Sequence, residues 1–423
     1  MNGHVDMPVQ SRSAAPSDGP GVRPYDPPPY DPPPGDLPTG DLPAGETLPY
    51  EALRERPRKG RGALTNRAGR YETLDRLAVD DGWGQTGKRT DDPADDEPPP
   101  LATSVSLDTS RSVIARNTSP DIGFDRSINP YRGCEHGCVY CFARPTHAWL
   151  GLSPGLDFET RLFAKPDAAG LLRRELAAPK YAPRAIAMGT NTDPYQPVER
   201  RMKITRAILE VLAEHDHPVS IVTKSATVCR DIDILAPMAE KGLASVAISV
   251  TTLDAALARA MEPRAAAPLR RLEAISTLAR AGIPVTVMVA PVIPGLTDHE
   301  LEAILIRARN AGATHAGYIL LRLPLELKAL FGEWLDTHLP DRKRRVLKRI
   351  REMRGGDLYR AGFGERMRGS GAGADLLATR FKLSCRQLGY AGEKPALDTS
   401  RFHRPAMTGL AAGAKRAGQL ELF

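Results

Sequence analysis

The stretch Ser127-Ile-Asn-Pro-Tyr-Arg-Gly-Cys-Glu-His-Gly-Cys-Val-Tyr-Cys-Phe142 joins a short apolar segment to a loop that holds three cysteines. Cys134, Cys138 and Cys141 are separated by three residues and then by two. Cysteine thiolates are the usual ligands of iron–sulfur clusters, and a cubane with three protein ligands leaves one iron open to an outside molecule. The spacing therefore favours an iron–sulfur cluster with one vacant position.

A zinc site or a redox disulfide is the alternative interpretation of this loop. A structural zinc site usually has four ligands, and the spacing of the two remaining cysteines, Cys229 and Cys385, gives no support for a shared metal. His136 lies inside the loop and offers a further ligand in principle, but we expect it to face solvent.

Short apolar segments alternate with amphipathic ones after this stretch, which predicts an α/β fold. We expect strands over 127–130, 185–189, 219–223, 245–250, 284–289 and 318–322. Helical patterns lie between them over 205–214, 232–241, 269–281 and 298–311, several of them followed by glycine. Repeated strand–helix units imply a parallel sheet covered by helices, and six units predict a partial (β/α)6 barrel. The cysteine loop follows the first strand, at the carboxyl end where such barrels place their active sites.

The cysteine spacing, with Tyr140 just before the last cysteine, resembles the signature of the radical S-adenosylmethionine (SAM) superfamily. The resemblance implies a 4Fe-4S cluster held by Cys134, Cys138 and Cys141, whose open iron binds SAM. It also implies reductive cleavage of SAM to a 5′-deoxyadenosyl radical, and an external electron donor such as flavodoxin or ferredoxin.

The same resemblance suggests SAM contacts at the other strand ends. Gly189 matches a Gly-Gly-Glu-like element, although the carboxylate here is Asp193, four residues on. The stretch 290–298 is similar to the superfamily's GxIxGxxE element, which flanks adenine. The residues expected to bind the cofactor are Tyr140, Gly189, Thr190, Asn191, Ser249, Thr251, Arg264, Ile293 and Gly295.

Three phrases, 127–134, 193–197 and 223–225, resemble more narrowly the bacterial proteins grouped with spore photoproduct lyase and labelled DNA repair photolyase-like. This narrower resemblance implies a lyase-type enzyme of DNA repair, in which an additional cysteine donates a hydrogen atom. Cys229 and Cys385 are the candidates, but for each the favoured alternative is a small buried hydrophobic residue, because free cysteine is among the most buried residue types.

Composition sets the first hundred residues apart. They hold 18 of the 38 prolines, which predicts a disordered extension over 1–100 with a basic arm near 58–71. We expect the partial barrel over 121–335, a helical C-terminal region over 336–405 and a flexible tail over 406–423. No run of eighteen apolar residues occurs, so we expect a cytoplasmic protein without a membrane partner.

The positive charge gathers outside the extension. Residues 1–100 carry 12 Lys/Arg and 18 Asp/Glu, so the overall charge of +7 leaves +13 on 101–423. The segment 341–354 has eight basic residues, with Val346, Leu347, Ile350 and Met353 at helical spacing. Its basic face suits a phosphate backbone, which makes DNA the expected partner. A solvated helix face is the alternative.

The last five residues, Gln419-Leu-Glu-Leu-Phe423, resemble the pentapeptide that docks bacterial proteins onto the replication sliding clamp. An apolar tail that folds back on its own domain is the alternative. Three functions are consistent with the whole sequence. They are a radical SAM enzyme acting on DNA, a radical SAM enzyme that modifies RNA, a peptide or a small molecule, and a non-catalytic iron–sulfur protein that binds DNA or senses redox state.

Overall fold

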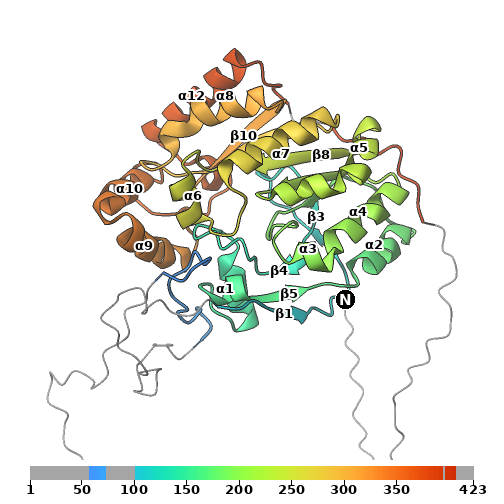
Figure 1. Ribbon diagram of the computed structural model, residues 1–423, viewed down its shortest axis with the longest axis horizontal. Helices are drawn as coiled ribbons and strands as arrows, with labels where there is room; N and C mark the ends of the chain where they lie inside the picture. Colours follow the sequence, from blue (N-terminus) through green and yellow to red (C-terminus); the bar gives the residue numbers. More distant parts are fainter. Residues whose placement is uncertain (1–56, 73–100, 394–395, 406–423) are drawn as a thin grey trace, which may run out of the picture. The chain divides into compact units, whose positions relative to one another are not determined.

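The computed structural model describes residues 57–72, 101–393 and 396–405, which are coloured in Figure 1. Most of the proline-rich extension, the flexible tail and the clamp-like residues Gln419–Phe423 lie outside the described residues, so the predictions made for them remain predictions. No helix among the described residues combines the length and apolar character needed to cross a bilayer.

The central feature is a seven-stranded sheet whose order is β10-β9-β8-β7-β6-β3-β2. Its strands are β2 (Ile114–Arg116), β3 (Arg126–Ile128), β6 (Ile186–Met188), β7 (Val219–Thr223), β8 (Ala244–Ser249), β9 (Val285–Val292) and β10 (His315–Leu320). From β3 to β10 each strand pairs with its neighbour in parallel, while β2 is antiparallel to β3. The predicted partial barrel of six parallel strands is therefore confirmed.

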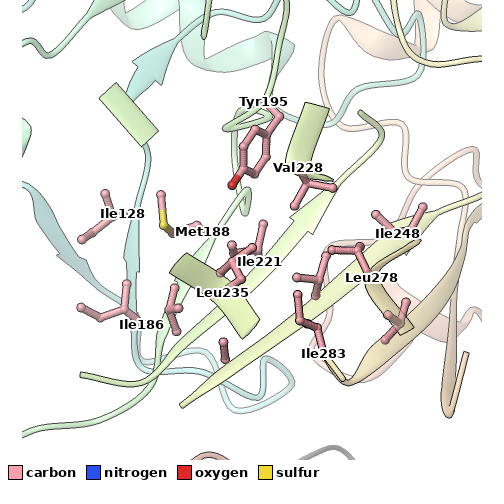
Figure 2. Close-up of a cluster of buried hydrophobic side chains, with 14 of the residues drawn as sticks. Ile128, Ile186, Met188, Tyr195, Ile221, Val228, Leu235, Ile248, Leu278 and Ile283 are labelled. Atoms are coloured by element: carbon pink, nitrogen blue, oxygen red, sulfur yellow. The ribbon is translucent and has the colours of Figure 1, made fainter. Parts of the chain in front are cut away.

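The helices over 168–177, 204–214, 232–240, 268–280, 301–310 and 372–387 pack on the outer face of this sheet, whereas those over 327–338 and 340–352 lie to one side and belong to another hydrophobic cluster (Figure 1). In chain order the helical segments are η2 (Arg144–Leu150), α1 (Asp157–Thr160), α2 (Ala168–Ala177), α3 (Glu199–Met202), α4 (Ile204–Glu214), η3 (Ala226–Asp231), α5 (Ile232–Glu240), α6 (Ala255–Met261), α7 (Pro268–Arg280), η4 (Asp298–Glu300), α8 (Leu301–Asn310), α9 (Leu327–His338), α10 (Pro340–Glu352), α11 (Glu365–Arg368) and α12 (Ala372–Gln387). Figure 2 shows part of the cluster between sheet and helices, with Ile221 of β7 close to Leu235 of α5 and Ile248 of β8 near Leu278 of α7.

The alternate residues of the strands face the inside of the barrel and are of mixed size. Because successive side chains of a strand point to opposite faces, the neighbours of the buried outward residues must point inward. Ser220, Ala247, Thr286 and Gly317 hold such positions and are only partly buried, as are the larger Val222, Met288 and Ile319. The thioether of Met288 fills the space beside Gly317, where a Cβ would stand 2.7 Å from its sulfur.

A second sheet of three strands, β1-β5-β4, was not expected from the sequence. It consists of β1 (Ser104–Leu107), β4 (Tyr131–Arg132) and β5 (Arg161–Ala164). Since β4 immediately precedes Gly133 and Cys134, this sheet fixes the start of the cysteine loop.

The basic segment near the C-terminus forms α10, as predicted. Val346, Ile350 and Met353 are buried and Leu347 is half-buried. Arg354, which the sequence placed on the basic face, is instead buried. It donates hydrogen bonds to the main-chain oxygens of Leu320 (3.3 Å) and Leu321 (2.6 Å) at the end of β10.

Candidate active site

The cysteine loop lies at the carboxyl end of β3, where the three thiols are sheltered from solvent. Cys134 and Cys138 are buried and Cys141 is partly buried. Burial raises the pKa of each thiol, and negative charge on Asp193, Cys138 or Cys141 raises the pKa of Cys134 further. The three sulfurs are thus within electrostatic range of one another, in surroundings that favour a thiolate only when a cation binds it.

A buried ion pair supports the main chain of this loop from outside. The Arg144 guanidinium donates to the main-chain oxygens of Gly137 (3.0 Å) and Cys138 (2.8 Å) and pairs with the Glu159 carboxylate. Neither charged side chain is exposed to solvent. Arg144 therefore determines the course of the loop between two of its cysteines.

The basic arm near 58–71 packs on the same ion pair. The amides of Gly62 and Ala63 donate to the Glu159 carboxylate at 3.0 and 2.8 Å, and the Arg61 guanidinium donates to its main-chain oxygen at 2.9 Å. A Cβ on Gly62 would stand 1.8 Å from the main-chain oxygen of Gly137. The arm thus lies in direct contact with the cysteine loop at a position where no side chain fits.

The expectation that His136 faces solvent is wrong. His136 is buried, and its Nδ1 lies 3.3 Å from the Asp193 carboxylate. That carboxylate also accepts hydrogen bonds from the Thr223 hydroxyl (2.7 Å) and the Lys224 amide (2.8 Å). Burial alone would raise the pKa of Asp193, but the charge of His136 and these hydrogen bonds lower it to about 2. Asp193 therefore ties the loops after β3, β6 and β7 together.

Tyr140 begins a chain of buried polar groups. The Thr251 hydroxyl donates to the Glu262 carboxylate at 2.6 Å, which leaves the Tyr140 hydroxyl as the donor in its 3.2 Å hydrogen bond with Thr251. Glu262 in turn pairs with Arg271, whose guanidinium donates to the main-chain oxygen of Ser249 at 3.1 Å. Three residues expected to contact the cofactor, Tyr140, Ser249 and Thr251, are thus joined at one strand end.

The loop after β6 is held by a residue that the sequence reasoning missed. The Asn129 side chain accepts hydrogen bonds from the amides of Asn191 (3.0 Å) and Thr192 (3.3 Å), and its amide group donates to the Thr190 hydroxyl (3.4 Å). Gly189 has a φ of 84°, and a Cβ there would stand 2.0 Å from the main-chain oxygen of Val222. A polar residue within the strand predicted over 127–130 was the signal that could have identified Asn129.

Arg264 is engaged by the cysteine loop itself. Its guanidinium lies 3.0 Å from the Glu135 carboxylate, and its amide donates to the main-chain oxygen of His136 at 3.3 Å. Its expected role as a partner of the SAM carboxylate stays a prediction.

Ile293 is buried in the same hydrophobic cluster as Cys138 and Tyr140. A Cβ on Gly295 would lie 3.3 Å from Cγ of Arg349 in α10. The loop after β9 therefore connects the cysteine loop with α10.

The two remaining cysteines lie elsewhere. The Cys229 thiol is in η3, 3.9 Å from the main-chain oxygen of Ala274 in α7, and Cys385 is in α12. Both pack against the large core cluster between sheet and helices, and in the described part of the chain neither belongs to the clusters that contain the cysteine loop. Their expected role as hydrogen-atom donors is untested.

The three cysteines of the loop suit a metal cluster in which each ligand binds a different metal ion. Across residues 57–72, 101–393 and 396–405, no three His, Cys, Asp or Glu side chains converge on a single metal ion. The five cysteines of the described residues are free thiols. A cubane cluster binds each thiolate to a different iron, so three sheltered thiols of one loop fit it.

Comparisons with known proteins agree with this chemistry. The family model of the radical SAM superfamily matches residues 128–308. Uncharacterized proteins of Mycobacterium tuberculosis and Mycobacterium bovis are each 39% identical over 241 residues, or 56% of this chain and 68% of theirs. An uncharacterized protein of Methanocaldococcus jannaschii is 29% identical over 173 residues, or 41% of this chain and 62% of its own. The chain belongs to the radical SAM superfamily.

Two solved structures were matched at low sequence identity. Spore photoproduct lyase complexed with dinucleoside spore photoproduct is 15% identical with a TM-score of 0.49, over 68% of this chain and 80% of the other. SuiB of Streptococcus suis bound to S-adenosylmethionine is 12% identical with a TM-score of 0.31, over 48% and 37%. As a member of the superfamily, this chain uses a 4Fe-4S cluster and SAM, and such enzymes typically need an external electron donor.

Proposed function

We propose that this radical SAM enzyme acts on DNA, as a lyase-type enzyme that repairs a lesion or a modified base. The observation that carries the proposal is the position of α10. In the described part of this helix, Arg342, Arg344, Arg345 and Arg351 are exposed and have no acidic partner. Unpaired arginines exposed around the solvent side of this helix suit the phosphates of a nucleic acid.

The basic face of α10 is fixed next to the cysteine loop. Val346 and Ile350 of α10 share one buried hydrophobic cluster with Cys138 and Tyr140. The cluster also includes Trp334 of α9, whose indole donates to the main-chain oxygen of Ala260 in α6 at 3.1 Å. Figure 1 shows α6, α9 and α10 gathered at one side of the sheet. A nucleic acid on α10 would therefore lie beside the site.

Exposed aromatic rings with arginines above them also support a nucleic acid. Trp149 and Tyr71 are 71% and 52% exposed, and their ring centroids are 4.8 Å apart. The Arg70 guanidinium lies 4.7 Å from the Tyr71 ring and 5.5 Å from the Trp149 ring. Bases of single strands stack on aromatic side chains of this kind, and arginine adds cation–π contacts.

Phe142, next to Cys141, is a further exposed aromatic residue with an arginine above its ring. It is 38% exposed, and the Arg322 guanidinium lies 4.4 Å from its ring centroid. Arg322 and Glu326, which pairs with Arg70 at 2.9 Å, both belong to the segment between β10 and α9. The aromatic and basic groups therefore surround one segment at the barrel opening.

When bound, the cluster and SAM would supply a 5′-deoxyadenosyl radical for abstraction of a hydrogen atom from the substrate. Cys134, Cys138 and Cys141 would hold the cluster, with Arg144 and Glu159 holding their loop. Tyr140, Thr251 and the loop shaped by Asn129 would orient SAM. The apolar cluster that contains Cys138, Tyr140 and Ile293 would keep water from the reacting atoms.

Two other functions remain as alternatives: radical modification of RNA, a peptide or a small molecule, and a non-catalytic iron–sulfur protein. The phrases 127–134, 193–197 and 223–225 favour the repair enzyme through their resemblance to the spore photoproduct lyase group. We keep the cytoplasm as the proposed location, since five free cysteines suit a reducing compartment.

Binding to DNA tests the proposal. Arg344→Glu/Arg345→Glu should weaken affinity for duplex DNA and lower the slope of log K against log salt by about 2, because each phosphate contact contributes about 0.9. Fluorescence anisotropy over a salt series measures both. Arg280→Glu/Arg307→Glu, an equal charge change at exposed positions of α7 and α8, is the matched control. Equal affinity and slope in the two double variants would refute the role of α10.

Binding to the sliding clamp through Gln419–Phe423 is a separate proposal that rests on the sequence alone. Deletion of residues 419–423 should abolish binding to purified clamp while SAM cleavage is unchanged. Undiminished clamp affinity after the deletion would rule it out.

A further inference from the structure

Arg354 carries a buried positive charge that has no carboxylate partner within the described part of the chain. It is 1% exposed, and its Nε is buried without a hydrogen-bond partner. Its other nitrogens donate to the main-chain oxygens of Glu365 (2.8 Å), Arg366 (3.0 Å), Leu320 (3.3 Å) and Leu321 (2.6 Å). Burial and the nearby positive charge of Arg322 lower the pKa of Arg354 to about 10. A buried charge without a partner of opposite sign is costly, so the end of β10 favours an anion.

Arg322, the residue after Leu321, is a second arginine without a carboxylate partner among residues 57–72, 101–393 and 396–405. Its guanidinium lies 4.4 Å from the ring centroid of Phe142 and donates to the sulfur of Met367 at 3.8 Å. The acidic side chains nearby are engaged by other arginines, Asp121 by Arg366 (2.7 Å) and Glu326 by Arg70 (2.9 Å). Since Arg322 is only half-buried, its terminal nitrogens remain available to a ligand.

Phe142 places this pair of arginines beside the cysteine loop. It follows Cys141 directly, and its ring is the surface on which the Arg322 guanidinium lies. Leu321 and Leu323, on either side of Arg322, belong to the buried hydrophobic cluster that the cysteine loop shares with α10. An anion bound to Arg322 would therefore lie next to the loop that holds the cluster.

We propose that Arg322 and Arg354 form an oxyanion subsite, in which Arg322 binds the phosphate next to the reacting nucleotide. This inference rests on the proposed function, because it takes the substrate to be DNA. The planar guanidinium of Arg322 suits two oxygens of one phosphate. Arg354 is a positioning residue that holds the main chain before Arg322 and adds its charge. The carboxylate of SAM offers the same chemistry as a phosphate, so the test must separate these two sources.

The test uses a ligand with a single phosphate. The reconstituted full-length protein, with its cluster oxidised and SAM present, is titrated calorimetrically with the dinucleotide d(TpT) and with its uncharged methylphosphonate analogue. The wild type should bind d(TpT) about tenfold more tightly than the analogue at low salt, because hydrogen bonds to a charged group are the stronger ones. Arg322→Gln should remove this preference, and Arg322→Lys, which keeps the charge, should retain part of it. Arg307→Gln, at an exposed position of α8, is the matched control and should keep the full preference.

Three results would overturn the subsite. The first is a wild type that binds the two dinucleotides equally or not at all. The second is an undiminished preference for d(TpT) in Arg322→Gln. The third is a tenfold loss of SAM affinity in Arg322→Gln with the preference for d(TpT) retained, which would assign Arg322 to the SAM carboxylate.

Failure of the proposed function would look different. If irradiated DNA did not raise the formation of 5′-deoxyadenosine, but the preference for d(TpT) still depended on Arg322, the phosphate subsite would be supported and the repair of DNA contradicted.

Discussion

Gly62→Ala tests whether the arm holds the cysteine loop. The new Cβ would meet the main-chain oxygen of Gly137 at 1.8 Å, whereas ordinary contacts begin at 3.4 Å, so arm and loop must separate by about 1.6 Å. Such a shift would break the hydrogen bonds of 3.0 and 2.8 Å from Gly62 and Ala63 to Glu159. Hydrogen bonds to a charged group contribute about 1.5–3 kcal/mol each, so the arm would lose roughly 3–6 kcal/mol of attachment.

The expected result is a folded protein whose cluster is held poorly. After anaerobic reconstitution, Gly62→Ala should contain less iron and sulfide and lose its cluster faster to a chelator, because Gly137 and the adjacent cysteines lose their support. Gly170→Ala is the control, since a Cβ at this exposed position of α2 meets nothing within 4 Å. If the two variants bound and kept the cluster equally well, the role given to the arm would be wrong.

Three further predictions concern other parts of the molecule. His217 is fully buried, and burial lowers the pKa of its imidazole from 6.5 to about 4. Because His217 of the unfolded chain is protonated at a higher pH than that of the folded chain, the free energy of unfolding falls as the pH drops from 6.5 to 4. His217→Gln should remove roughly 3 kcal/mol of this pH dependence in urea unfolding at several pH values; an unaltered profile would contradict the assignment. Glu262→Gln leaves Arg271 buried without its partner and should destabilise by about 3–5 kcal/mol, against less than about 1 kcal/mol for the exposed Glu273→Gln, as denaturant midpoints would show. Trp149→Ala should weaken binding of single-stranded DNA by about 1–3 kcal/mol, whereas Trp149→Phe should retain most of the affinity. If anisotropy titrations gave the two variants the same affinity, base stacking on Trp149 would be excluded.

The repeating part of the fold could be predicted from the sequence because burial leaves a periodic record. The strand predicted over 219–223 coincides with β7, in which every second residue is buried. The prediction over 318–322 missed the first half of β10, where Ala316 and Gly317 lack β-branched character. The three-stranded sheet was missed because β4 has two residues and β5 has four, too few to show a period.

The site could be predicted only where its chemistry is local. Three cysteines in one loop mark a cluster in any fold, whereas Glu159 and Asn129 act through partners far along the chain. The Glu159 carboxylate accepts hydrogen bonds from the amides of Gly62 and Ala63, which are nearly a hundred residues away in the sequence. His136 was misjudged for the same reason, because its partner Asp193 comes from the loop after another strand.

The measurement that tests the account most directly is SAM cleavage in the presence of DNA. The reconstituted and reduced protein is incubated with SAM and either undamaged or irradiated duplex DNA, and 5′-deoxyadenosine is quantified. The account predicts that irradiated DNA raises its formation, and that Arg344→Glu/Arg345→Glu removes this increase but keeps the basal rate. Formation at the same rate with or without DNA of either kind would contradict a DNA substrate, and no formation at all would indicate a non-catalytic iron–sulfur protein.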